Sequence, residues 1–188
     1  MIQVDRFFPT CVVKSVNLDI ANALLPICEK YIAVSNTTLL NTDNFPTTLY
    51  NTKLNSSVNQ EPVVQQVLSY VINNHAGALA EECGIDYNAI NFRPYGFFSS
   101  MNKYAFLKRH MHCNATFAGL VYLDIGEDVP PICFHDPRQA ATFGDSTASH
   151  VVEVKPENGM IMLWNAWLEH EIPQKLNDNA RKVFSFNL

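Results

Sequence analysis

Three histidines have the residue type and spacing of a metal site. His110 and His112 form an H-x-H pair directly before an apolar segment, and His170 follows a second apolar segment about sixty residues later. On a strand, residues i and i+2 point to the same face, so the paired imidazoles can converge on one ion. Imidazole suits iron, zinc, copper or nickel, and three protein ligands leave positions open for catalysis. The pattern predicts a mononuclear metal site inside a β-barrel, although H-x-H pairs also occur on solvated strand faces.

Composition narrows the class of protein that could carry such a site. The chain has 188 residues, of which 47% are apolar and 16% charged, and this predicts a single globular domain over residues 1–188. A net charge of -5 argues against binding of nucleic acid or membranes through bulk charge. Five widely spaced cysteines and a start without a signal-peptide pattern predict a cytoplasmic protein. The glycines form neither a dinucleotide fingerprint nor a P-loop.

Residues 1–85 are expected to be mainly helical. Asn17 or Asp19 can cap a first helix, and Asn59 can cap a second helix with Pro62 in its first turn. Between them, residues 35–59 are rich in Asn, Thr and Ser. A long structureless stretch is uncommon in a compact domain, so we expect a surface arm, edge strands or a lid over the site.

Residues 86–188 have the sequence pattern of a β-sheet protein. Short apolar segments alternate with turn residues, and strands are predicted at 89–93, 116–123, 132–134, 151–154, 159–163 and 182–186. Many short strands without intervening helices indicate an antiparallel sandwich or barrel. The whole chain is therefore predicted to be α+β, mainly β, with the helices first. We also expect Trp164 and Trp167 to orient His170, and His75 to lie at the surface or a helix end.

Four segments, in order, resemble the sequence blocks of one family. They read H-M-H-C-N-A-T-F-A-G-L-V-Y-L at 110–123, I-C-F-H-D-P-R at 132–138, a block ending W-L-E-H at 156–170, and R-K-V-F-S-F-N at 181–187. The chain thus resembles the 2-oxoglutarate/Fe(II)-dependent oxygenases of bacteria and tailed phages, which are similar to prolyl hydroxylases. The resemblance covers residues 86–188. It implies a double-stranded β-helix (jelly-roll), with N-terminal helices packed on the larger sheet.

The resemblance also implies a cofactor, a co-substrate and a reaction. Such enzymes bind Fe(II) and 2-oxoglutarate, decarboxylate the latter to succinate and CO2, and usually hydroxylate a C–H bond of a second substrate. His110 and His170 match the family's iron ligands. His112 occupies the position where the wider superfamily has a carboxylate, so either His112 completes the iron site or Asp136 substitutes for it.

The same resemblance implies a site for the distal carboxylate of 2-oxoglutarate. Arg181 lies close to the family's spacing for the pairing cation, and guanidinium can grip a carboxylate with two hydrogen bonds. Tyr122 resembles the assisting tyrosine. Position 183, where a hydroxyl is usual, is Val, and Ser185 is expected on the same strand face as a substitute.

Two other functions stay open from the sequence. A cupin-like metalloenzyme could use the same three histidines without 2-oxoglutarate, although residues 113–118 lack the Glu that cupins usually add. A non-catalytic jelly-roll binding module, or a structural phage component, is the alternative outside enzymes. The partners predicted are a small-molecule co-substrate, an unknown primary substrate and a second copy in a homodimer. A phage-encoded protein would act in the host cytoplasm.

Overall fold

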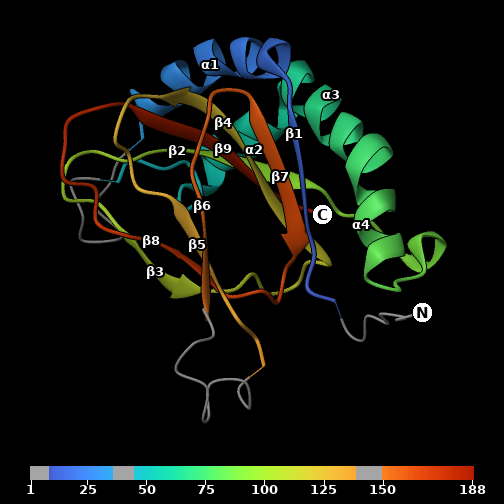
Figure 1. Cartoon of the computed structure of the whole chain (residues 1–188). Coiled ribbons are helices and arrows are strands. Elements are labelled where there is room, and N and C mark those ends of the chain that lie inside the picture. The colour runs from blue at the N-terminus through green and yellow to red at the C-terminus, as the bar shows by residue number, and fades with distance from the viewer. Residues whose placement is uncertain (1–8, 36–44, 139–149) are drawn as a thin grey trace.

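The computed structural model describes residues 9–35, 45–138 and 150–188 (Figure 1). Its helices are α1 (Leu18–Ile32), α2 (Thr52–Gln60), α3 (Pro62–Val71) and α4 (Gly77–Glu82). Its strands are β1 (Val12–Val16), β2 (Tyr95–Ser100), β3 (Leu107–His110), β4 (Phe117–Ile125), β5 (Ile132–His135), β6 (Val151–Val154), β7 (Met160–Asn165), β8 (His170–Ile172) and β9 (Arg181–Asn187).

The strands form two antiparallel sheets. The larger sheet has the order β1-β7-β4-β9-β2 and the smaller has the order β3-β8-β5-β6. Helices α1, α3 and α4 cover the outer face of the larger sheet (Figure 1). The predicted α+β jelly-roll, with its helices on the larger sheet, is confirmed.

Alternation along the strands of the larger sheet builds two apolar cores. In β4, Phe117 and Val121 pack against the helices, whereas Leu120 and Tyr122 pack toward the smaller sheet. Successive side chains of a strand point to opposite faces, so one buried strand serves both layers. β9 follows the same rule. Phe184 belongs to the helix-facing core, and the opposite face of the strand is directed into the barrel.

The first helix begins where the sequence predicted, but the second does not. The side-chain oxygen of Asn17 accepts a hydrogen bond from the Ile20 amide at 3.2 Å and caps α1. Asn59 was expected to be an N-cap and instead lies inside α2, where its amide group exchanges two hydrogen bonds with the Gly96 backbone. Asn51 caps α2. The expectation for residues 35–59 is therefore wrong for 52–59, which are helical, and residues 36–44 lie outside the described part of the chain.

Three other local predictions are corrected by the structure. Residues 89–93 form no strand, and the strand that follows begins at Tyr95. His75 is only 3% exposed, because the π-helical turn Ile72–Ala76 directs its ring inward, where Nε2 lies 2.6 Å from the hydroxyl of Ser15. Trp167 is 48% exposed, and among the described residues the tryptophan whose ring contacts His170 is Trp164. Among the described residues, no helix is long and apolar enough to cross a membrane.

Candidate metal and co-substrate site

The three histidines singled out in the sequence meet at one end of the barrel. His110 ends β3 and His170 begins β8, and these two residues are direct partners in the antiparallel register. His112 joins them, so that one ring nitrogen of each imidazole lies within 4.8 Å of the others. The rings of His110 and His170 have centroids 4.3 Å apart, and those of His112 and His170 are 5.2 Å apart. This convergence suits a single ion held by three nitrogen donors.

Backbone contacts determine which ring nitrogens face the common centre. Nδ1 of His110 donates to the carbonyl of Lys108 at 2.7 Å, and Nδ1 of His170 donates to the carbonyl of Leu168 at 2.9 Å. A carbonyl can only accept, so Nδ1 carries the proton in both rings. Nε2 therefore keeps its lone pair, which is the form that a metal ion requires. Such backbone acceptors orient ligating histidines in known metal sites.

His112 reaches the cluster by a different route from the one predicted. The H-x-H spacing predicted both histidines on one strand, but β3 ends at His110 and His112 lies in the loop beyond it. The amide of His112 donates to the carbonyl of Ala166 at 2.9 Å, which ties this loop to the turn that precedes His170. Tertiary contact, and not strand alternation, brings the third imidazole to the site.

The electrostatics of the cluster favour the neutral form of His112 and His170. Burial lowers the pKa of His170 to about 3, with a further contribution from His110. Burial and His110 also lower the pKa of His112, and the neighbouring Asn187 side chain acts in the opposite direction. Trp164 contacts the His170 ring edge-on at 5.0 Å and adds to its apolar surroundings. Neutral rings with free lone pairs are ready to bind a cation without first losing protons.

A buried cation lies in the opposite layer of the barrel, on the larger sheet. Arg181, at the start of β9, is fully buried, and its Nη1 donates to the sulfur of Met101 at 3.1 Å. Its Nε and Nη2 have no hydrogen-bond partner, and neither has the hydroxyl of Tyr122, whose ring centroid lies 5.4 Å from the guanidinium carbon. Within the described residues, no carboxylate pairs with Arg181. A buried charge without a partner is costly, so these groups form a preformed anion site.

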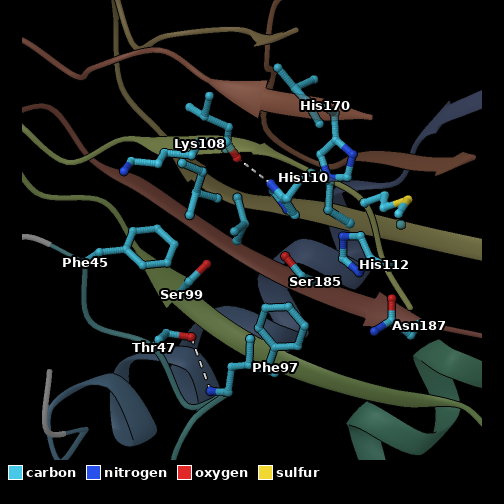
Figure 2. A pocket seen from close by; sticks show the side chains of 18 of the residues that line it. Phe45, Thr47, Phe97, Ser99, Lys108, His110, His112, His170, Ser185 and Asn187 are labelled. Atoms are coloured by element: carbon cyan, nitrogen blue, oxygen red, sulfur yellow. Dashed lines mark hydrogen bonds between the residues drawn. The ribbon is translucent and has the colours of Figure 1, made fainter. Parts of the chain in front are cut away.

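One pocket of about 630 Å³ is lined by the three histidines and by Arg181. Ser185 and Asn187 alternate with apolar residues along β9, and both line the pocket on the same face as Arg181. The sequence prediction that Ser185 shares the strand face of Arg181 therefore agrees with the structure. Tyr122 is not part of the pocket wall, although its ring lies next to the guanidinium of Arg181. Figure 2 shows the three histidines on one side of the pocket and Phe45 and Phe97 on the other.

Asp136, the alternative carboxylate ligand, is engaged elsewhere. Its two oxygens accept hydrogen bonds from the backbone and side chain of Arg138, which lower the pKa of Asp136 to about 2. Asp136 does not belong to the cluster of converging metal donors. The arrangement of the described residues thus brings together three histidines and leaves the carboxylate outside.

Sequence reasoning missed a group of residues that rim the pocket. They are Phe45, Tyr50, Phe106 and Met111, which come from a loop, the approach to β3 and the H-x-H pair itself. Met111 was detectable, since it separates the two paired histidines. Nothing local marks the other three, which reach the pocket only through long-range packing such as the bridge between Thr47 and Ser99.

Comparisons with solved structures show the same fold. A prolyl-4-hydroxylase from Pseudomonas putida superposes with a TM-score of 0.61 at 12% identity, covering 95% of this chain and 87% of that one. A prolyl hydroxylase from Trichoplax adhaerens, in complex with a hypoxia-inducible-factor peptide fragment, gives 0.63 at 12% identity over 94% and 82%. HygX from Streptomyces hygroscopicus, with nickel and 2-oxoglutarate bound, gives 0.56 at 12% identity over 95% and 83%.

Comparisons of sequence find one matching family model. No match was found among curated proteins. The family model described as "Putative 2OG-Fe(II) oxygenase" matches residues 97–187, which contain all three histidines, Tyr122, Ser185 and Arg181. With the jelly-roll topology and the three-histidine cluster already in place, this match shows that residues 97–187 are similar to the family described as "Putative 2OG-Fe(II) oxygenase".

Proposed function

We propose that this protein is an Fe(II)- and 2-oxoglutarate-dependent oxygenase that hydroxylates a C–H bond of a second substrate. The observation that carries the proposal is that one pocket joins three converging imidazoles with a buried guanidinium that lacks an acidic partner among the described residues. A metal site alone would not require the guanidinium. A cation and a metal site in one pocket suit a ligand that chelates with one end and carries a carboxylate at the other.

The histidine cluster fits Fe(II) in donor type and protonation. His110, His112 and His170 would hold the ion, and the backbone acceptors of the first and third present Nε2 to it. Imidazole is a common ligand of non-haem iron, and three donors leave positions for other ligands. The cluster among the described residues contains no carboxylate, so the protein ligands do not compensate the charge of the ion. An anionic co-substrate would supply that compensation.

The opposite end of the pocket fits the distal carboxylate of 2-oxoglutarate. Nε and Nη2 of Arg181 are the two donors left without partners, and a carboxylate accepts from such a pair in parallel. Ser185 offers a hydroxyl on the same wall, and the ring of Tyr122 lies next to the guanidinium. HygX, which shares the fold, has nickel and 2-oxoglutarate bound in its structure, and this agrees with the proposed pair of ligands.

Each group of the chain then has a definite task. The bound iron and 2-oxoglutarate would supply oxidative decarboxylation coupled to insertion of oxygen into a C–H bond. Arg181 binds and orients the dicarboxylate, and the histidines position the metal next to it. Trp164 and Phe134 pack around His170 and exclude water from that side of the centre. A dry, preorganised site favours the coupled reaction over unproductive oxidation.

The test is an anaerobic titration of the metal-free protein with Fe(II) and 2-oxoglutarate, followed through the visible metal-to-ligand charge-transfer band. We expect the band in the unaltered protein and its loss in Arg181→Met. Iron binding without a band would contradict the use of 2-oxoglutarate and favour the cupin-like alternative. Binding of neither ligand would favour a jelly-roll that serves as a scaffold.

A further inference from the structure

The two ends of the pocket differ in their access to solvent. Around Arg181 the pocket is closed by buried apolar residues, with Phe45 at 8% and Met101 at 2% exposure. Around the histidines it is open, and exposed large side chains gather there: Tyr50 at 48%, Tyr95 at 37% and Met111 at 54%. A second substrate must therefore enter at the histidine end.

The open end is directly connected to the histidines. Met111 lies between His110 and His112 in the sequence, and the hydroxyl of Tyr95 accepts a hydrogen bond from Nδ2 of Asn187 at 2.5 Å. Asn187 in turn neighbours His112 (Figure 2). Phe106, which is 41% exposed, borders the same pocket from the approach to β3. Exposed aromatic and thioether side chains are costly to leave in water, and gathered at a cavity they mark a binding surface for an apolar group.

The charge of the pocket lining is positive. Lys108 lines the pocket, and no Asp or Glu among the described residues does so. Lys108 forms no ion pair within the described part of the chain. If the proposed function holds, the two charges of Fe(II) and the one of Arg181 together exceed the two negative charges of 2-oxoglutarate, because the three histidines add none. The loaded site therefore attracts a further anion and repels a cation.

From these observations we propose that the primary substrate presents an aromatic ring together with a negative charge. The ring contacts Tyr50, Tyr95 and Met111 at the histidine end, and the anion faces Lys108. This assignment rests on the proposed function for the positive charge of the loaded centre. The ring and the anion can belong to a free aromatic acid or to neighbouring side chains of a peptide, and both sources share the same recognition chemistry.

The experiment uses protein loaded anaerobically with Fe(II) and 2-oxoglutarate, so that Arg181 is occupied before a probe is added. Formation of the charge-transfer band is checked first, and its absence would count against the proposed function, not against the substrate class. Calorimetry then compares phenylpropionate, phenylpropanol, phenylpropylamine and butyrate. We expect phenylpropionate to bind at least about tenfold more tightly than the amine or butyrate, since these lack the anion and the ring respectively.

Two variants test which side chains contact the probes. Lys108→Gln should weaken phenylpropionate by about threefold and leave phenylpropanol unchanged, because the lysine is exposed and its ion pair is modest. Met111→Ala should weaken both probes equally, because it removes an apolar contact at the histidine end. A short peptide with phenylalanine beside glutamate distinguishes the two sources. If the peptide binds more tightly than phenylpropionate, the substrate is a peptide. If it binds more weakly, the substrate is a free aromatic acid. Equal binding of acid and amine, or displacement of 2-oxoglutarate by phenylpropionate, would overturn the proposal.

Discussion

Arg181 and Tyr122 are both fully buried, and the guanidinium carbon lies 5.4 Å from the centre of the phenol ring. Burial lowers the pKa of Arg181, and Tyr122 counteracts this effect. The pair leaves three polar atoms without partners: Nε and Nη2 of the arginine and the hydroxyl of the tyrosine. Such a pair destabilises the free protein and becomes favourable when an anion binds, so it is a feature of function and not of stability.

Replacing Arg181 should therefore have opposite effects on stability and binding. In Arg181→Met, the free energy of unfolding of the metal-free protein should rise by about 1–2 kcal/mol, because a buried unpaired charge is removed. The affinity for 2-oxoglutarate should fall at least about thirtyfold. Thermal unfolding and the charge-transfer titration measure the two quantities. Lys182→Met is the matched control, since Lys182 is the next residue in β9 and pairs with Glu29 and Asp124. Loss of stability in Arg181→Met would contradict the assignment of an unpaired buried charge.

Removing the Tyr122 hydroxyl should have a smaller effect. Tyr122 contacts Arg181 but does not line the pocket, so Tyr122→Phe should weaken 2-oxoglutarate binding by about threefold to tenfold. The free energy of unfolding should fall only slightly, because Tyr122 counteracts the effect of burial on the Arg181 charge and its hydroxyl makes no other hydrogen bond among the described residues. Ser185→Ala provides a comparison on the pocket wall. If Tyr122→Phe abolished binding completely, Tyr122 would contact the ligand directly instead of positioning Arg181.

The proposed metal site predicts different effects on Fe(II) affinity for different histidines. His110→Ala, His112→Ala and His170→Ala should each reduce the Fe(II) affinity at least about tenfold, because each removes one of three donors. His135→Ala is the control: His135 lies at the end of β5, 3.4 Å from Glu171 and outside the cluster. Metal titration with iron analysis checks the result. Equal losses in the control would show that the variants fail for structural reasons.

His112 and Asp136 can be separated as candidates for the third ligand. Asp136→Asn should leave iron stoichiometry unchanged, since both carboxylate oxygens are held by Arg138. His112→Ala should lower the iron stoichiometry. The opposite pattern would move Asp136 into the metal site and restore the carboxylate that the wider superfamily carries.

Two glycines test the packing of the fold. At Gly119 in β4, an added Cβ would lie 2.5 Å from the carbonyl oxygen of Met162 and from the ring of Phe186. Gly119→Ala should therefore lower the free energy of unfolding by about 1–3 kcal/mol. At Gly77 nothing lies within 4 Å of an added Cβ, and Gly77→Ala should raise it by about 0.5–1 kcal/mol through helix propensity. Denaturant unfolding measures both, and equal effects would contradict the difference in packing between the two positions.

Local patterns in the sequence determined the parts of the fold that depend on neighbouring residues. Asn17 caps α1 because its side chain needs only an amide three residues away. The alternation that buries Leu120 and Phe184 on opposite faces of the larger sheet is likewise a property of each strand by itself. The order of the histidines and Arg181 was equally visible, and with the family resemblance it indicated the type of chemistry.

Tertiary structure decided the features that depend on distant partners. Asn59 carries the same capping signal as Asn17, but its bonds to Gly96, far along the chain, place it inside a helix. His112 reaches the metal cluster through Ala166 and not through strand alternation. Phe45, Tyr50, Phe106 and Met111 line one pocket although they come from separate segments of the chain. Hydrogen bonds and burial between remote residues outweigh local preference at these positions, so the sequence alone indicated the donors but not how they meet.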